Sequence, residues 1–271
     1  MPVRVTVHPI PPWMDGERLL GDGPWEVEGP RWSAGLERPA AADLIARLRG
    51  LGFGGKPLEV EVQPRLKPAL IRAAKTRDAR ARRDTTPGFA KTRTKTDAEG
   101  RWSLTPEALA VKIAEEWRGA TVIDATCGAG GNAIAFARAG CSVTAIDVHR
   151  GRLDLARHNA RTYQVDSQIR FLLGDARTLL SDMDADLVFV DPPWSTDWNR
   201  TLTGLDDLPL LRPLLAAIPK GAHWIAKVPP SFDPAVLPQT TPTAWFGVAD
   251  GDRHRVKFLS LIHISEPTRP Y

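Results

Sequence analysis

The sequence has little cysteine and no long hydrophobic run, and each absence excludes a class of protein. Its 271 residues contain two cysteines, Cys127 and Cys141. Two thiols cannot build a disulfide framework or a zinc ribbon, and they fit a reducing compartment. No apolar stretch approaches the roughly 20 residues that a membrane-spanning helix needs, and residues 1–4 lack the apolar core of a signal peptide. We therefore expect a cytoplasmic protein without a membrane partner.

The histidines also lack a pattern. The six are scattered along the chain without the spacing typical of metal ligands. We therefore expect no metal cofactor. The chain length suits one large α/β domain with an appendage, and nothing in the sequence requires more than a monomer.

Charge is distributed unevenly. Residues 65–95 contain eleven lysines and arginines but only Asp78 and Asp84 as acids, so they carry a charge of +9. The whole chain carries +4, which leaves about −5 on the remainder. A basic block beside a slightly acidic body is typical of a polyanion-binding surface, although a solvated helix face would have the same composition. The residues expected to contact RNA phosphates are Arg72, Lys75, Arg77, Arg80, Arg82 and Arg83.

The first hundred residues are irregular. Residues 1–64, rich in Pro, Gly and Trp, predict a small α+β region with a short helix over 44–51 and a strand over 58–62. Pro68 suits the first turn of a helix that runs to about Arg83, and a polar basic segment follows to about Gly100. We expect residues 65–100 to form a basic arm. Residues 265–271 fit neither part and are interpreted as a tail, either disordered or non-native.

Residues 101–264 alternate regularly between helix and strand. Thr105 and Pro106 are expected to begin a helix, with the threonine as N-cap. Strands are expected over 121–126, 142–148, 169–173, 187–190, 223–228, 243–248 and 255–262. Helices are expected over 105–117, 132–139, 152–162 and 208–218, with a short one after the third strand. This order predicts a doubly wound, mostly parallel sheet with helices on both faces and a C-terminal antiparallel hairpin.

A glycine-rich loop follows the first of these strands. Asp124-Ala-Thr-Cys-Gly128-Ala-Gly130-Gly-Asn132 leads from a strand into a helix, and glycine lets a ligand approach the backbone closely. Asp147 ends the next strand, where a carboxylate can bind ribose hydroxyls. The loop alone fits both NAD and S-adenosylmethionine. Asp124 favours the latter, because it could bind the ammonium of a methionine moiety but would repel a pyrophosphate.

Asp175 adds a second indication for S-adenosylmethionine. It ends the third strand, where an adenine amino group could be read, although a helix N-cap would explain it too. The predicted cofactor-binding residues are Thr105, Pro106, Asp124, Thr126, Cys127, Gly128, Gly130, Asn132, Asp147, Val148, Asp175 and Ala176.

The fourth strand ends in Asp191-Pro192-Pro193-Trp194. An amino group on a nucleobase is a poor nucleophile, because its lone pair is delocalised into the ring. Asp191 and the carbonyl of Pro192 offer hydrogen-bond acceptors to such an amine, and two prolines hold the turn rigid. Trp194 offers a face on which a base can stack, and such stacking is worth roughly 1–3 kcal/mol. We predict Asp191, Pro192, Pro193 and Trp194 as catalytic residues; a turn with a packed tryptophan is the alternative.

Residues 95–195 resemble the trimethylguanosine synthase family of RNA cap guanine-N2 methyltransferases and their prokaryotic relatives. The resemblance lies in the segment Gly100 to Glu107, the DATCGAGGN loop, Ala145-Ile-Asp147, the helix around Asn159, Gly174-Asp175 and PPW. It implies a seven-stranded class I methyltransferase fold, S-adenosylmethionine as cofactor, and the N2 amino group of a guanine in RNA as acceptor. It also implies that Thr105 and Pro106 border the cofactor and that Trp194 stacks on the guanine.

Two alternatives to guanine N2 remain. Asp191 stands where eukaryotic members of the family usually have serine, and aspartate at this position occurs both in bacterial rRNA guanine-N2 enzymes and in adenine-N6 methyltransferases. An adenine-N6 enzyme acting on RNA or DNA is therefore the second hypothesis. A non-catalytic RNA-binding protein with the same fold is the third, and the intact Asp124, Asp147 and Asp191 argue against it. Trp198 and Trp245 could form a second wall of a base pocket, but core packing is the preferred explanation.

Overall fold

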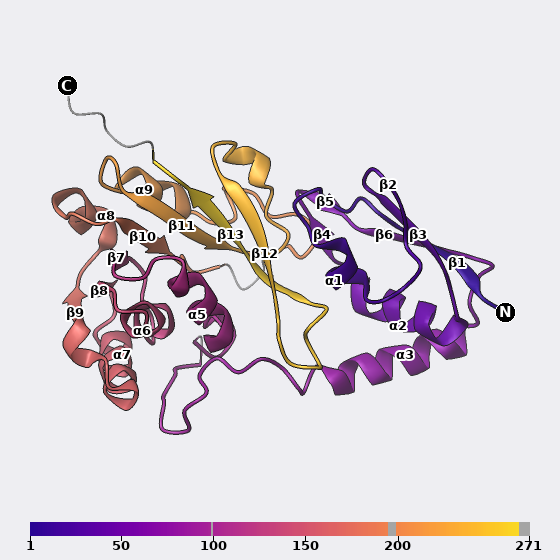
Figure 1. The fold of residues 1–271 in the computed structure, drawn as a ribbon, viewed down its shortest axis with the longest axis horizontal. Coiled ribbons are helices and arrows are strands. Elements are labelled where there is room, and N and C mark those ends of the chain that lie inside the picture. Colours follow the sequence, from indigo (N-terminus) through magenta and orange to yellow (C-terminus); the bar gives the residue numbers. More distant parts are fainter. Residues whose placement is uncertain (99, 195–198, 266–271) are drawn as a thin grey trace.

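The chain folds around two large sheets. A computed structural model describes residues 1–98, 100–194 and 199–265. In Figure 1 the N-terminal elements lie at the right and the larger, seven-stranded sheet at the left. The expected tail lies outside the described residues, except for Ser265.

The seven-stranded sheet has the order β12-β13-β11-β10-β7-β8-β9. Neighbouring strands from β11 to β9 are parallel, whereas β13 is antiparallel to both β11 and β12. The strands are β7 Thr121–Asp124, β8 Ser142–Asp147, β9 Ile169–Leu173, β10 Leu187–Val190, β11 His223–Val228, β12 Thr241–Phe246 and β13 Val256–His263. The expected class I methyltransferase fold is confirmed, including its single antiparallel strand.

Each face of this sheet carries its own core, as the alternation along β10 shows. Leu187 and Phe189 point into one core, which also includes residues of three helices: α5 Glu107–Glu115, α6 Gly131–Arg138 and α7 Arg150–Tyr163. Val188 and Val190 point into the other, which includes residues of α8 Ala176–Leu179 and α9 Leu211–Ala216. Because all four residues are apolar, β10 is buried on both faces, as parallel strands between helix layers are.

The N-terminal region contains a four-stranded sheet of order β2-β3-β1-β6. Its elements are β1 Val3–His8, α1 Gly16–Leu20, β2 Glu26–Glu28, β3 Arg31–Leu36, α2 Arg38–Leu48, the short pair β4 Gly52–Phe53 and β5 Lys56–Pro57, and β6 Glu59–Gln63. Val3, Val5 and Val7 of β1 are fully buried and face α2, because alternate side chains of a strand point to the same side.

The basic arm begins with α3 Pro68–Ala81, the predicted helix. Only Ala74 of α3 is buried. After α3 the chain is tied to the loop between β12 and β13: the buried carboxylate of Asp252 accepts hydrogen bonds from the backbone N–H and the hydroxyl of Thr86, both at 2.8 Å. Arg255 also pairs with Asp78 of α3. The contacts of Asp78 and Thr86 therefore anchor the arm near the end of α3. The arm runs along the lower edge of the molecule in Figure 1.

Three expectations about elements were inaccurate. The helix expected over 44–51 is α2, which begins six residues earlier at Arg38-Pro39 and ends before Gly50, whose φ is +71°. The helix expected over 208–218 is limited to Leu211–Ala216. Thr105 is not the N-cap of α5: Pro106 occupies that position with extended backbone angles, and the Thr105 side chain points into a buried site. The remaining short helices are α4 Gly100–Ser103, η1 Asp166–Gln168, η2 Leu180–Asp182 and η3 Pro234–Val236.

The domain boundaries expected at residues 64 and 100 stay a prediction. Phe246 and Ala244 of β12, a strand of the seven-stranded sheet, pack into the core of the N-terminal region, so that core also contains residues from beyond the boundaries. Within the described residues, every helix is too short or too polar to cross a membrane.

Candidate active site

A cleft of about 960 Å³ opens at the carboxyl ends of β7, β8, β9 and β10. This is the edge of an open α/β sheet at which ligands bind, and the volume suits a nucleoside-sized ligand together with a base. Among the predicted cofactor-binding residues, those that line it are Thr105, Thr126, Cys127, Gly128, Asn132, Asp147, Val148, Asp175 and Ala176. The predicted catalytic residues Asp191, Pro192, Pro193 and Trp194 line it as well. Pro106, Asp124 and Gly130 do not: all three are buried behind the lining.

The glycine-rich loop has the backbone geometry that its sequence predicts. Gly128 and Gly130 have φ of +51° and +88°, where other residues would be strained. A Cβ on Gly131 would come within 2.6 Å of Leu104. The loop is held to the next strand by Asp147, whose carboxylate accepts from the backbone N–H of Gly128 at 2.9 Å and of His149 at 2.8 Å. Asp147 thus presents a fixed carboxylate to the cleft.

Asp124 ends β7 beneath this loop. Its side chain is fully buried, and neither carboxylate oxygen makes a hydrogen bond of ordinary geometry within the described part of the chain. Burial, reinforced by the nearby charge of Asp191, raises the pKa of Asp124 to about 7; the backbone N–H groups of Thr126 and Ala133 oppose the shift. A buried carboxylate without a cationic partner fits an ammonium group of a ligand, because a bound cation would compensate the charge.

A covering segment, residues 95–98 and 100–105, lies on the cofactor side of the cleft, with Asp97, Ser103 and Thr105 among the residues that line it. The buried Asn159 of α7 holds it: its amide oxygen accepts from Lys95 N–H at 2.8 Å, and its amide nitrogen donates to the carbonyls of Lys95 and Ala129. Arg152 bonds Asp97 at 3.1 Å. The Thr105 hydroxyl ends the segment, fully buried and without a hydrogen-bond partner among the residues described. It is a second buried polar group that a ligand in the cleft would satisfy.

Asp175 is the N-cap of α8, accepting from Arg177 N–H at 2.9 Å, and it forms an ion pair with the Arg177 side chain at 2.5 Å. That pairing holds the pKa of Asp175 below its usual range. Asp175 therefore caps α8, which is the alternative role that its position in the sequence suggested. Recognition of an adenine amino group by Asp175, which lines the cleft, stays a prediction.

The acceptor turn is joined to the cofactor loop. The hydroxyl of Thr126 accepts a hydrogen bond from the backbone N–H of Asp191 at 2.8 Å. Thr126 was predicted from the loop motif as a cofactor residue, and the structure gives it this additional contact. The turn that would hold a base is therefore fixed relative to the loop that would hold the methyl donor.

Sequence reasoning missed Lys227, near the end of β11. Its Nζ donates to Asp191 Oδ2 at 2.7 Å and to the carbonyl of Ser103 at 2.5 Å, and it lies 5.4 Å from the centre of the Trp194 ring. The side chains of Lys227 and Asp191 are 4% and 13% exposed. Burial raises the pKa of Asp191, and Lys227 opposes that shift. A lysine that interrupts the apolar strand His223–Val228 was the available signal, because lysines are rarely buried without a partner.

Other predicted side chains have ordinary roles. Burial raises the pKa of the Cys127 and Cys141 thiols, which fits packing residues rather than nucleophiles. Trp245 stacks on Phe258 and bonds Ser260, so it belongs to the core. Trp198 lies outside the described residues.

The six arm residues predicted to contact RNA are all exposed. Arg77 pairs with Asp43 at 2.7 Å and Arg82 with Asp78 at 2.9 Å. No ion pair to a described residue is found for Arg72, Lys75, Arg80 or Arg83. On α3, Arg72 lies opposite the buried Ala74, and Lys75 and Arg80 lie on the two flanks between them, as the helical period of about 3.6 residues requires. The arm therefore presents uncompensated positive charge to solvent.

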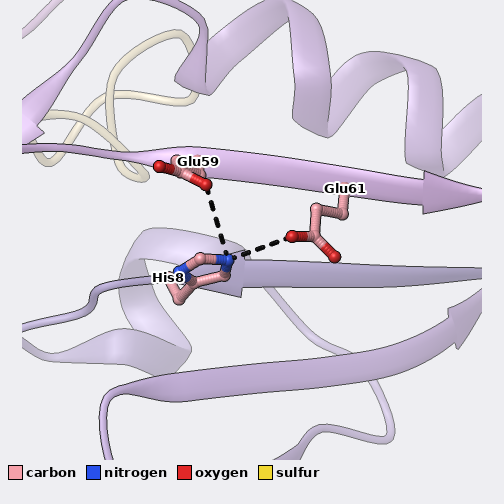
Figure 2. A group of neighbouring side chains, drawn as sticks. All are labelled: His8, Glu59 and Glu61. Atoms are coloured by element: carbon pink, nitrogen blue, oxygen red, sulfur yellow. Dashed lines mark hydrogen bonds and ion pairs between the residues drawn. The ribbon is translucent and has the colours of Figure 1, made fainter.

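A group of possible metal ligands was not visible in the sequence spacing. Figure 2 shows the His8 ring between two carboxylates of β6, with Nε2 at 3.3 Å from Glu61 and 3.8 Å from Glu59. Both glutamates are more than half exposed. A hydrogen bond between His8 and Glu61, on the neighbouring strands β1 and β6, explains the arrangement, and the expected absence of a metal stays a prediction.

Comparison with known proteins relates the cleft to a family. Residues 119–200, which include the loop, Asp147, Asp175 and the acceptor turn, match the family model described as RNA cap guanine-N2 methyltransferase. The resemblance expected from the sequence is confirmed. This match also decides between the two cofactors that the loop alone left open, in favour of S-adenosylmethionine.

Three curated relatives agree with this match. An uncharacterised RNA methyltransferase of Gloeobacter violaceus is 44% identical over 73 residues, covering 27% of this chain and 16% of the relative. Trimethylguanosine synthase of Schizosaccharomyces pombe is 32% identical over 124 residues, covering 41% and 52%. Ribosomal RNA small subunit methyltransferase J of Rhodopseudomonas palustris is 38% identical over 112 residues, covering 38% and 50%. The chain thus spans about half or less of the length of these relatives.

Proposed function

We propose that this protein is an S-adenosylmethionine-dependent RNA methyltransferase that acts on the N2 amino group of guanine. The observation that supports it most is the placement of Asp191: a buried carboxylate, tied through Thr126 to the cofactor loop, at the edge of one cleft that holds both. The family match over residues 119–200 points to the same acceptor.

In this proposal two carboxylates on the cofactor side of the cleft bind two polar groups of the methyl donor. Asp147 binds the ribose hydroxyls, and Asp124 compensates the ammonium group directly or through water. Asp147 is in place before the ligand arrives, since its carboxylate is fixed by Gly128 and His149. When bound, S-adenosylmethionine supplies an electrophilic methyl group on a sulfonium.

The acceptor side positions the amine. Asp191 accepts a hydrogen bond from an N–H of the base, which draws the nitrogen toward the geometry in which its lone pair is available. The Pro192 carbonyl accepts a second one, and Trp194 stacks on the ring. Because these groups are held rigid, the protein's contribution is positioning and electrostatic stabilisation rather than removal of a proton before attack.

The chemistry of the base edge favours guanine over adenine. Guanine presents two adjacent donors, N1–H and the N2 amino group, whereas adenine presents its N6 amino group beside an N1 acceptor. An ionised carboxylate can only accept hydrogen bonds, so it suits the guanine edge.

The basic arm is proposed to bind the phosphates of the RNA. Arg72, Lys75, Arg80 and Arg83 carry the charge that no described acid compensates, while Arg77 and Arg82 are partly neutralised by Asp43 and Asp78. Phosphate contacts give affinity and orientation without reading sequence, which leaves selection of the base to the cleft.

The test is to incubate the purified protein with labelled S-adenosylmethionine and total RNA or DNA, and to identify the methylated nucleoside. N2-methylguanosine is the expected product. Detection of N6-methyladenine would instead identify adenine as the acceptor. Donor binding without transfer to any nucleic acid would favour the third hypothesis, an RNA-binding protein that has lost turnover.

A further inference from the structure

Lys227 contacts both Asp191 and Trp194 of the acceptor turn. Its ammonium group bonds Asp191 Oδ2 of the acceptor turn and the Ser103 carbonyl of the covering segment. It also lies over the rings of Trp194 and Phe258, at 5.4 and 5.5 Å from their centres. Three segments that are distant in sequence, the acceptor turn, the covering segment and β13, therefore meet at this buried cation of β11.

The ion pair leaves Asp191 with one oxygen for a ligand. Lys227 takes Oδ2, the backbone N–H of Asp191 is bound by Thr126, and Oδ1 makes no hydrogen bond within the described part of the chain. Asp191 lines the cleft, so a base that enters it meets a carboxylate whose orientation is already fixed. Fixing an acceptor in advance avoids the cost of reorganising it during the reaction.

The charges around Asp191 show why a cation is required there. Asp124 faces it from β7, and Asp147 lies beyond Asp124 at the end of β8; both are acids. Lys227, from β11, is the cation in hydrogen-bond contact with Asp191 among the described residues. Burial favours the protonated form of Asp191 and Lys227 opposes it, and only the ionised form can accept from the N–H of a base.

We propose that Lys227 is a positioning residue of the transfer step: it keeps Asp191 ionised and turned so that Oδ1 accepts from the amino edge of guanine. This inference rests on the proposed function, in that it assigns Lys227 a task in the same reaction. It also gives the preference for guanine a physical source, because a protonated Asp191 would present a donor that suits the N1 acceptor of adenine.

The experiment compares Lys227→Met with the wild-type protein in single-turnover methyl transfer to RNA between pH 5.5 and 9. Without the cation, the acid limb of the rate profile is expected to move up by about 1 to 3 pH units, the range that an opposite charge in contact produces. Transfer should thus be lost at low pH and largely recovered at high pH. Lys227→Arg should keep the limb near its wild-type position.

Arg255→Met serves as the matched control. It also breaks an ion pair that is largely shielded from solvent, with Asp78, but outside the cleft. It should lower stability without moving the acid limb. A Lys227→Met protein that binds donor yet keeps the wild-type acid limb would overturn the proposal, as would a loss of rate that is equal at every pH.

A second measurement needs no RNA, and its first part needs no folded Lys227 variant. The carbonyl stretch of a protonated Asp191, isolated as the infrared difference between wild type and Asp191→Asn, is followed as a function of pH. The proposal requires the band to be absent at neutral pH; a protonated Asp191 at pH 7 contradicts it. If the wild-type protein methylates no guanine, the proposed function fails, while the infrared titration still reports whether Asp191 is ionised beside Lys227, and the same titration in Lys227→Met reports whether the lysine is the cause.

Discussion

Asp124 and Asp191 are two buried carboxylates at the ends of the neighbouring strands β7 and β10, and they differ in what compensates their charge. Asp191 has Lys227 at 2.7 Å. Asp124 has no cation in contact among the described residues, and its pKa rises to about 7. The protein therefore provides the counter-charge on the acceptor side of the cleft and leaves it to the ligand on the cofactor side.

This difference follows from what each side has to bind. A methyl donor with an ammonium group brings its own cation, so an uncompensated carboxylate gives affinity and selectivity for it. A nucleobase edge is neutral, so the carboxylate that meets it must be kept ionised by the protein. Substitutions at either carboxylate should therefore have different and measurable consequences.

The largest effect is expected at Asp191. Asp191→Ala should lower the rate of methyl transfer by about 10²–10³-fold, as the loss of a preorganised hydrogen-bonding group in an active site does, while donor binding is retained. Single-turnover transfer and equilibrium binding of the donor measure the two quantities separately. Full activity in this variant would remove Asp191 from the mechanism.

The next effect concerns the stability of the ligand-free protein. The pKa of Asp124 rises from an ordinary 3.8 to about 7 on folding. Between these values the unfolded chain releases this proton while the folded protein keeps it. The stability that Asp124 contributes is therefore full below about pH 4 and is lost as pH rises to about 7. The difference corresponds to about 2–4 kcal/mol after allowance for relaxation of the site.

Asp124→Asn removes this titration. The variant should match the wild type at pH 4 and exceed its unfolding free energy at pH 8 by that amount. Comparison of the two proteins by urea denaturation isolates Asp124 from Asp97, Glu107 and Asp252, whose pKa values are lowered and whose contributions to stability increase with pH. Equal stabilities at pH 8 would show that Asp124 carries no uncompensated charge.

The contrast between the two carboxylates also shows what the sequence could reveal. The cofactor side was predictable because one continuous stretch, from Asp124 to Asn132, fixes the loop, and Asp147 follows at the spacing of one helix and one strand. The acceptor turn was predictable for the same reason, from Asp191 to Trp194. Lys227 was not, because it lies 36 residues beyond Asp191 and reaches it only through the parallel pairing of β10 with β11.

Local patterns predict some elements and mislead on others. The strand β1 has alternating valines at 3, 5 and 7, and this pattern could have predicted it from the sequence. The N-cap of α5 could not be assigned in the same way, since Thr105-Pro106 is a regular helix start by its residue types. The Thr105 side chain is instead directed into the cleft region, and the tertiary structure overrides the local preference.

A smaller effect is expected in donor binding. Because the ammonium group needs an ionised Asp124, affinity for S-adenosylmethionine should fall about tenfold for each pH unit below about 7, with release of a proton on binding. Asp124→Asn should weaken binding by about 10- to 100-fold and abolish the pH dependence. Calorimetry in buffers of different ionisation enthalpy measures both quantities.

Asp191→Asn sharpens this test. The charge of Asp191 is one of the causes that raise the pKa of Asp124, so its removal should move the midpoint of the pH dependence to lower pH without abolishing it. A pH-independent affinity in the wild-type protein would exclude Asp124 as the partner of the ammonium group.

The smallest effect is expected far from both carboxylates, on the basic arm. Replacing Arg72, Lys75, Arg80 and Arg83 by glutamine should weaken RNA binding and reduce the slope of log affinity against log salt by about 0.7–0.9 for each RNA phosphate that the variant no longer binds. The matched control replaces Arg77 and Arg82, which Asp43 and Asp78 already pair, and its slope should change less. An unchanged slope in the first variant would mean that α3 presents only a solvated face. A reduced slope with unchanged guanine selectivity would show that the arm orients the RNA while the cleft selects the base.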